Sequence, residues 1–166
     1  MQVLPDDVVV SATEVVKAAL ARGVMMVTVE SCTGGLVAGA LTAVPGSSAA
    51  VEAGFVTYSN AAKTRLVGVD AAIIQAHGAV SEETARAMAE GALARGGGGL
   101  AVSITGIAGP GGGSADKPVG LVHFATAGPK GVRHREERFG DLGRDGVRHA
   151  AVLTALAMLK EQLADD

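Results

Sequence analysis

The chain has 166 residues, of which 48% are hydrophobic and 19% are charged, a composition that excludes a disordered polar tail and favours one globular domain with a sizeable core. Its net charge of −3 argues against a protein whose main task is to coat nucleic acid, and no apolar run is long enough to span a membrane. A single cysteine excludes an intrachain disulfide framework and a cysteine zinc site, and the acidic first residues are not a signal peptide. We therefore expect a cytoplasmic protein with neither nucleic acid nor a membrane as its partner.

The first third of the chain alternates between helical and strand patterns. The continuous apolar run at 24–29 predicts a strand that is buried on both faces, and a second strand is expected at 52–59. Helices are predicted at 8–22, 36–43 and 61–66. This alternation is typical of an α/β sheet protein.

The later elements continue this organisation. Ser81, followed by two glutamates, predicts the start of a helix that ends near Arg95. After it we expect a strand at 100–105, a glycine loop at 106–118, a hairpin of strands at 119–127 and 132–139, and a last helix at 144–163. The whole chain, residues 1–166, is predicted to form one domain with an α/β fold, a three-layer α/β/α sandwich around a mixed, mostly parallel sheet of about five strands.

A tight turn with two nucleophilic side chains follows the first predicted strand. Ser31 and Cys32 lie there just before a predicted helix start, where backbone amides favour a phosphate or a developing oxyanion. Ser31 is therefore a candidate nucleophile, and the alternative is that Ser31 or Thr33 caps the helix. Cys32 is either a rival nucleophile or a small, inert core residue.

The four histidines do not supply a general base for this serine. His77 lies in a predicted loop, His123 in a strand of the hairpin, and His134 and His149 in the charged C-terminal third. No two of them have the spacing of metal ligands, so no metal site is predicted. A serine hydrolase built on this turn needs a base other than histidine.

Residues 58–63 offer such a base. Tyr58 at the end of one predicted strand and Lys63 in the helix that follows would share one edge of the sheet with Ser31 if their strands are parallel neighbours. Lys63 can deprotonate a serine only if its pKa falls from about 10.4 towards neutrality, and the alternative is a solvated lysine in the first helical turn. Asn60 is either a helix cap or a substrate contact.

The glycine loop after the strand at 100–105 is a second unusual segment. Its amides can form a concave anion site, although it matches neither a P-loop nor a dinucleotide fingerprint, and a flexible connection is the alternative. Arg144 and Arg148 lie on one face of the last predicted helix, so one of them could reach a phosphate. The acidic residues interleaved with the neighbouring arginines favour a solvated, salt-bridged surface.

Four motifs in this order resemble one known family: Glu30-Ser-Cys-Thr-Gly-Gly, Tyr58-Ser-Asn with Lys63, Gly78-Ala-Val-Ser-Glu-Glu-Thr-Ala, and Thr105-Gly-Ile-Ala-Gly-Pro-Gly-Gly-Gly with Lys117-Pro-Val-Gly. They are similar to the C-terminal domain family of the competence/damage-inducible protein CinA, over nearly the whole chain. Enzymatic members of that family are nicotinamide-nucleotide amidohydrolases, which hydrolyse the carboxamide of nicotinamide mononucleotide. Many relatives carry a preceding domain for which this chain leaves no room, so the resemblance implies the stand-alone form.

The resemblance implies a metal-independent Ser/Lys amidase that needs no cofactor, with Ser31 as nucleophile, Lys63 as base and Tyr58 as a residue that orients or relays the proton. We assign contacts with the nucleotide substrate to residues of the turn, the loop and the last helix: Thr33, Gly34, Gly35, Asn60, Thr105, Gly106, Gly109, Gly111, Gly112, Arg144 and Arg148. One alternative is a non-catalytic nucleotide-binding or regulatory module, and another is an interaction subunit. The apolar excess also leads us to expect a homo-oligomer, which light scattering would test.

Overall fold

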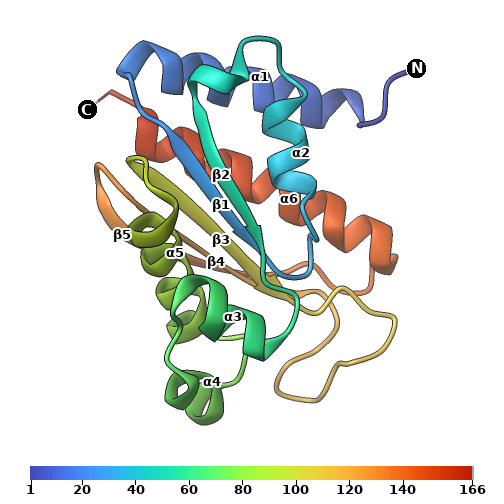
Figure 1. Cartoon of the computed structure of the whole chain (residues 1–166). Coiled ribbons are helices and arrows are strands. Elements are labelled where there is room, and N and C mark those ends of the chain that lie inside the picture. The colour runs from blue at the N-terminus through green and yellow to red at the C-terminus, as the bar shows by residue number, and fades with distance from the viewer. Residues whose placement is uncertain (166) are drawn as a thin grey trace.

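The structure, a computed structural model, describes residues 1–165 and contains a five-stranded mixed sheet with the order β2-β1-β3-β4-β5 (Figure 1). β1 is parallel to both of its neighbours, whereas β4 is antiparallel to both of its own. The predicted mixed sheet and the C-terminal hairpin are thereby confirmed. The strands are β1 (Met26–Glu30), β2 (Val51–Val56), β3 (Leu100–Gly106), β4 (Leu121–Gly128) and β5 (Gly131–Arg138).

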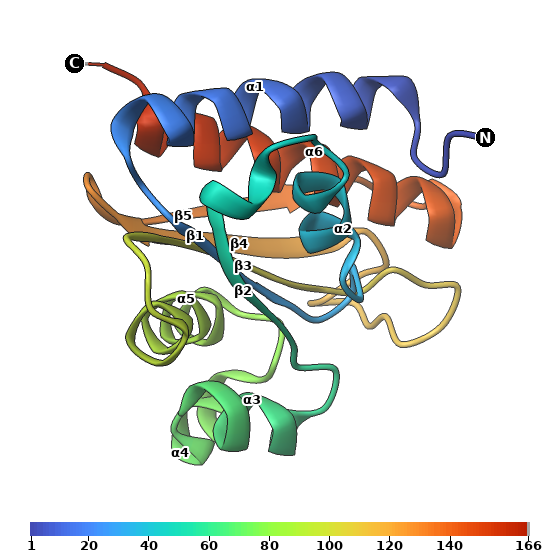
Figure 2. The same ribbon diagram turned by 45° about the horizontal axis from the view of Figure 1, so that its top comes forward.

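Helices cover both faces of this sheet. The first, second and last α-helices lie on one face and the other three on the opposite face, which gives the expected three-layer α/β/α arrangement (Figures 1 and 2). No helix within residues 1–165 combines the length and hydropathy that crossing a membrane requires. The helices are α1 (Asp6–Arg22), α2 (Leu36–Thr42), α3 (Asn60–Val67), α4 (Ala71–His77), α5 (Glu82–Gly96) and α6 (Gly143–Leu163), with a short 3₁₀ helix, η1 (Ser47–Ala49).

The hydrophobic core lies in two layers, one on each side of the sheet. Between the sheet and the pair α1 and α6, fully buried side chains include Met26, Phe124 and Leu156. On the α5 side, Val27 and Met88 belong to a second cluster. Every residue of β1 is buried, as the continuous apolar run predicted, because β1 is an interior strand with helices on both faces.

Two local differences from the predicted elements have clear physical reasons. His77 is the last residue of α4 and does not lie in a loop. This helix has only seven residues, begins after the N-cap Asp70 and buries only Ile74, so its apolar sequence pattern is weak. β1 begins at Met26, later than predicted, because the amide of Val24 still donates to the carbonyl of Ala19 and completes the end of α1.

The strand order also determines where a ligand can bind. β2, the next strand in the chain after β1, pairs with one edge of β1, whereas β3 pairs with the opposite edge. The direction in which strands are added to the sheet therefore reverses between β1 and β3. In open α/β sheets, ligands bind beyond the carboxyl ends of the strands at such a point. The turn at 31–35 and the glycine loop after β3 both begin there.

Candidate functional site

Ser31 and Lys63 meet at the carboxyl ends of the parallel strands β1 and β2. Ser31 follows β1 directly, and its backbone amide donates to the carbonyl of Ile104 on β3. Lys63 lies in α3, and its Nζ is 3.1 Å from Oγ of Ser31. The two side chains therefore share one edge of the sheet, as the sequence predicted for parallel neighbouring strands.

Lys63 reaches Ser31 from inside the protein. Ser59 begins α3 as its N-cap, since its Oγ accepts a hydrogen bond from the amide of Ala62 at 3.0 Å. In the next turn, Lys63 Nζ donates to the carbonyl oxygen of Thr57 at 2.9 Å. Only 1% of the Lys63 surface is exposed, so the alternative of a solvated lysine is wrong.

The surroundings of Lys63 favour its neutral amine. Burial lowers the pKa of the Lys63 ammonium below its usual range, and the charge of the Cys32 thiolate acts in the opposite direction to a smaller extent. The Thr57 carbonyl can only accept a hydrogen bond, so it binds an N–H of Lys63 and leaves the nitrogen lone pair for Ser31. A neutral Lys63 can therefore accept the hydroxyl proton of Ser31.

Cys32 is the other nucleophilic side chain at the turn. Burial, followed by the negative charge of Glu30, raises the pKa of the Cys32 thiol to about 11, although its own backbone amide, Arg148 and Lys63 oppose the rise. The reactive thiolate is then a minor species at neutral pH. These properties favour the inert interpretation of Cys32 and leave Ser31 as the stronger candidate.

Neither Ser31 nor Thr33 caps α2. The N-cap is Gly35, a left-handed residue with φ of 104°, and the carboxylate of Glu30 accepts hydrogen bonds from the amides of Val37 and Ala38 at 2.9 and 3.0 Å. The capping alternative for Ser31 is therefore wrong, and its hydroxyl remains paired with Lys63. Glu30 was not predicted as a site residue, and its sequence signal is a carboxylate at the end of an otherwise apolar run.

The backbone amides of the turn separate into bonded and available groups. The amide of Gly34, a predicted substrate contact, donates to the carbonyl of Ser31 at 3.0 Å and is therefore not free to bind a ligand. Within residues 1–165, the amides of Cys32 and Thr33 have no acceptor in another residue. These two amides directly follow Ser31 in the chain, and Cys32 lines the same pocket as Ser31. The amide of the residue after a serine nucleophile is one that commonly stabilises an oxyanion.

An open pocket of about 250 Å³ lies between this turn and the glycine loop. The predicted loop residues Gly106, Gly109, Gly111 and Gly112 line it together with Ser31. The amides of Gly111 and Gly112 donate to no other group in the described part of the chain, so they are available to an anion. The remaining lining residues are Cys32, Tyr58, Ile107, Ala108 and Arg144, of which Ile107 and Ala108 were not predicted.

Arg144 at the start of α6 bridges the mouth of this pocket. Its Nη1 donates to the carbonyl of Gly109 and its Nη2 donates to the hydroxyl of Tyr58, both at 2.8 Å. Tyr58 is 60% exposed, and no hydrogen bond joins it to Ser31 or Lys63 in residues 1–165. Its position fits a contact with a ligand better than the expected proton relay.

Six predicted substrate contacts do not line the pocket: Thr33, Gly34 and Gly35 of the turn, and Asn60, Thr105 and Arg148 elsewhere. Asn60 lines a separate hollow between α3 and α4. It is not the helix cap either, since Ser59 caps α3. Thr105 is buried, and its hydroxyl donates to the carbonyl of Ala79, which joins β3 to the segment before α5. Arg148 donates to the carbonyl of Thr33 at 3.3 Å and so contacts the turn from behind.

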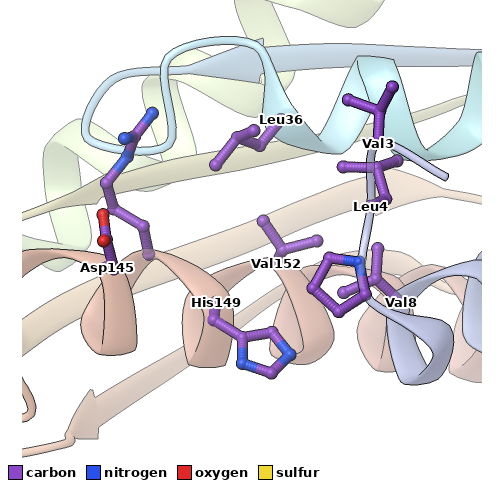
Figure 3. Close-up of a pocket in the computed structure, with 9 residues that line it drawn as sticks. Val3, Leu4, Val8, Leu36, Asp145, His149 and Val152 are labelled. Carbon is purple, nitrogen blue, oxygen red and sulfur yellow. The ribbon is translucent and has the colours of Figure 1, made fainter. Parts of the chain in front are cut away.

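Arg148 also lines an apolar cavity of about 350 Å³ on the far side of the turn. In Figure 3, Val3 and Leu4 of the N-terminal segment lie opposite Leu36 of α2 and Val152 of α6. Ser31 and Lys63 are not among the residues that line this cavity. Besides apolar side chains, Asp145, Arg148 and His149 line this cavity, but no serine, cysteine or lysine does. The smaller pocket beside the glycine loop, which Ser31 lines, is therefore the stronger candidate site.

The fold places His123 and His134 in contact, which their spacing in the sequence did not predict. Nδ1 of His123 on β4 lies 2.8 Å from Nε2 of His134 on β5, and the rings stack with centroids 5.1 Å apart. Within residues 1–165, no group of three or more metal-binding side chains is close enough to hold an ion. This pair faces α5 and does not line the pocket that contains Ser31.

Comparison with known proteins agrees with the fold and the motifs. Residues 9–163 match the family model described as the CinA C-terminal domain. The chain belongs to the CinA C-terminal domain family. A CinA-like protein of Anaeromyxobacter sp. (strain K) is 55% identical over 141 residues, which cover 84% of this chain and 34% of that relative. A CinA-like protein of Parasynechococcus marenigrum (strain WH8102) is 50% identical over 155 residues, which cover 92% of this chain and 37% of the relative. The chain thus spans about a third of the length of these curated CinA relatives.

Solved CinA structures extend the similarity to three dimensions. The competence/damage inducible protein CihA from Agrobacterium tumefaciens is 52% identical, with a TM-score of 0.96 over 99% of this chain and 100% of that chain. A CinA superfamily protein from Klebsiella pneumoniae is 37% identical, with a TM-score of 0.89 over 94% of this chain and 97% of that one. The family and the α/β fold expected from the sequence motifs are confirmed.

Proposed function

We propose that this chain hydrolyses the carboxamide of nicotinamide mononucleotide to nicotinate mononucleotide and ammonia, with Ser31 and Lys63 as a catalytic pair. The observation that carries the proposal is the hydrogen bond between Lys63 Nζ and Ser31 Oγ, at 3.1 Å, beside a pocket that Ser31 lines. A nucleophilic serine needs an adjacent base, and a lysine can be that base when burial lowers its pKa. Membership of the CinA C-terminal domain family supports the same reaction through the resemblance of the motifs.

The first half of the reaction forms an acyl-enzyme. Oγ of Ser31 bonds to the amide carbon while its proton moves to Nζ of Lys63, and the carbonyl oxygen becomes an oxyanion beside the amides of Cys32 and Thr33. When the tetrahedral intermediate collapses, the carbon–nitrogen bond breaks and Lys63 gives its proton to the departing ammonia. Lys63 is then neutral again.

The second half releases the acid. A water molecule gives a proton to Lys63 as its oxygen bonds to the acyl carbon, and collapse of the second intermediate breaks the bond to Ser31. The proton returns from Lys63 to Oγ of Ser31. One base thus serves both halves, because the Thr57 carbonyl keeps the Lys63 amine next to the serine throughout.

The phosphate of the substrate would bind at the other end of the pocket. The free amides of Gly111 and Gly112 and the guanidinium of Arg144 offer donors and positive charge there. Tyr58 and the Gly109 carbonyl hold Arg144 over the pocket mouth, in a position from which it could bind the incoming phosphate. The nucleotide would then lie with its carboxamide at Ser31 and its phosphate at the loop.

The test is ammonia release from nicotinamide mononucleotide by the purified chain in the presence of EDTA. We expect metal-independent turnover that falls by at least about 10³-fold in Ser31→Ala and in Lys63→Ala. Ser48→Ala and Lys17→Ala, exposed residues outside the pocket, are matched controls that should retain activity. Binding of the nucleotide to a folded wild-type chain without turnover would contradict the proposal and select a non-catalytic nucleotide-binding module.

A further inference from the structure

Glu30 is a fully buried acidic side chain that the proposed reaction does not use. It ends β1 directly before Ser31 and has an exposed fraction of 0%. No lysine, arginine or histidine of residues 1–165 forms an ion pair with it. Burying an unpaired carboxylate is costly unless hydrogen bonds replace its hydration, so the partners of Glu30 need an explanation.

The partners of Glu30 all come from the segment that follows the nucleophile. Oε1 accepts from the hydroxyl of Thr33 at 2.7 Å and from the amide of Val37 at 2.9 Å, and Oε2 accepts from the amide of Ala38 at 3.0 Å. Because donors approach both Oε1 and Oε2, both of these atoms must accept hydrogen bonds. A glutamine would place its NH₂ group, which is a donor, against one of these donors. The position therefore selects a carboxylate.

This arrangement fixes Thr33 from two sides. Its hydroxyl is bound by Glu30, and its carbonyl accepts from the amide of Leu36 at 3.1 Å and from Nη2 of Arg148 at 3.3 Å. The amide of Thr33 and the preceding amide of Cys32 then have fixed directions and no acceptor in another residue of the described chain. These are the two amides that directly follow Ser31 in the chain.

We infer that Glu30 is a positioning residue for the oxyanion donors of the nucleophile turn. Through the hydroxyl of Thr33 and the start of α2, its carboxylate holds the amides of Cys32 and Thr33 beside Ser31. Glu30 hydrogen-bonds neither the side chain of Ser31 nor that of Lys63. The inference rests on the proposed function, since it states which groups stabilise the charge that this reaction develops.

The sharpest test breaks one hydrogen bond and keeps the shape of the side chain. Thr33→Val removes the hydroxyl that Glu30 accepts from, whereas Thr33→Ser retains it, and both keep the backbone amide. Misplaced oxyanion donors lower kcat, so we expect kcat of Thr33→Val to fall by about 10-fold or more, with KM within about two-fold of wild type. Thr33→Ser should restore most of the activity, and Glu30→Gln should resemble Thr33→Val.

The matched control makes the same substitution at the other end of the sheet. Thr126 on β4 is also a buried threonine whose Oγ1 takes part in a side-chain hydrogen bond, from Gln162 at 3.0 Å. Thr126→Val should therefore lose a similar amount of thermal stability while keeping the wild-type kcat. A folded Thr33→Val chain with wild-type kcat, or with a raised KM alone, would overturn the inference even if Glu30→Gln does not fold.

A second readout separates this inference from the proposed function. An alkyl fluorophosphonate phosphonylates an activated serine: a bond forms between Ser31 Oγ and phosphorus, the phosphorus–fluorine bond breaks, and the serine proton passes to Lys63 as fluoride leaves. We expect the labelling rate of Ser31 to fall in Thr33→Val by about the same factor as kcat, because the phosphonyl oxygen needs the same amides. If the wild type is labelled but hydrolyses no nucleotide, the substrate proposal fails. The ratio of the labelling rates of wild type and Thr33→Val then still decides the role of Glu30. If Ser31 is not labelled at all, both fail.

Discussion

At the scale of single residues, the environment of Lys63 distinguishes this site from an ordinary serine turn. The side chain combines almost complete burial, a carbonyl acceptor and a serine hydroxyl as its contacts. Desolvation is the first cause of its lowered pKa, so the amine is neutral over a wider pH range than in an exposed lysine. A pH profile therefore tests the role of Lys63 directly.

We predict that kcat/KM for amide hydrolysis rises with pH and levels off above the pKa of Lys63, which lies below the usual lysine range. The sign follows because only the unprotonated amine accepts the serine proton. Lys63→Arg should be inactive between about pH 6 and pH 10, since a guanidinium keeps its proton there. Ammonia release measured across this range checks both statements, and a flat wild-type profile or an active arginine variant would count against a lysine base.

The candidate site was predictable only where a residue type by itself indicates its chemistry. Ser31 and Lys63 stood out as a nucleophile and a base in separate motifs, and the parallel pairing of β1 and β2 brings them together. Asn60 and Thr105 were misplaced, because a pattern does not show which way a side chain points. Glu30 was missed because its three hydrogen bonds exist only once α2 folds back onto β1.

At the scale of elements, α5 is packed closely against the end of α3. Gly91 lies inside α5, and a Cβ built at this position would come within 1.8 Å of the carbonyl oxygen of Val67. A backbone oxygen cannot move aside as a flexible side chain can. The approach of the two helices therefore requires a residue without a side chain at position 91.

Gly91→Ala should destabilise the chain by at least about 1–3 kcal/mol through overpacking, even though alanine is the better helix former. Gly39→Ala is the matched control, because Gly39 lies inside α2 with nothing within 4 Å of its added Cβ. That variant should be more stable than wild type by about 0.5–1 kcal/mol. Urea unfolding of the two variants measures the contrast, and equal effects would show that α5 can shift away from α3.

The elements themselves were largely predictable. Long segments with a clear period, such as α1, α5 and α6, and the hairpin of β4 and β5 were expected within a few residues of their observed ends. α4 was not expected, because a helix of seven residues with one buried side chain carries little apolar pattern. Its stability comes from packing against α3 and α5, which is tertiary information.

At the scale of the whole molecule, the stacked pair His123 and His134 links stability to pH. Burial is the first cause that lowers the pKa of each imidazole, and for His123 the charge of His134 comes second. The folded chain then binds protons less readily than the unfolded chain, in which histidine has a pKa of about 6.5. The surrounding charges that modulate this are Glu82, Glu83, Arg86, Lys117 and Glu136.

We therefore predict that the contribution of these histidines to the free energy of unfolding is constant well above pH 6.5 and decreases as the pH falls through about 6.5. Glu82, whose pKa is lowered chiefly by its hydrogen bond to Arg86, contributes a loss of the same sign only in more acidic solution, as the pH falls below the usual glutamate pKa. His134→Asn should reduce the loss between about pH 7 and pH 5, since one of the two buried imidazoles is gone. Urea unfolding at these two pH values gives the difference, and an unchanged slope in the variant would contradict it.

The arrangement of the whole sheet was predictable as a class but not in detail. Alternating helices and buried strands indicated a three-layer α/β/α fold with a mixed sheet, and the CinA structures confirm it. The position of β1 between β2 and β3, which creates the pocket, depends on contacts between residues far apart in the chain. Local patterns contain no information about such neighbours.

The pocket beside the glycine loop draws its walls from four distant parts of the chain, at Ser31, Tyr58, residues 106–112 and Arg144. A ligand that fills it contacts all four at once and can bind only the fully folded chain. By thermodynamic linkage its binding free energy is then added to the unfolding free energy of the entire protein, about 2.7 kcal/mol when the ligand is present at 100 times its Kd. Thermal melting in the presence of candidate pyridine nucleotides can thus rank the ligands of this chain without any assumption about the reaction.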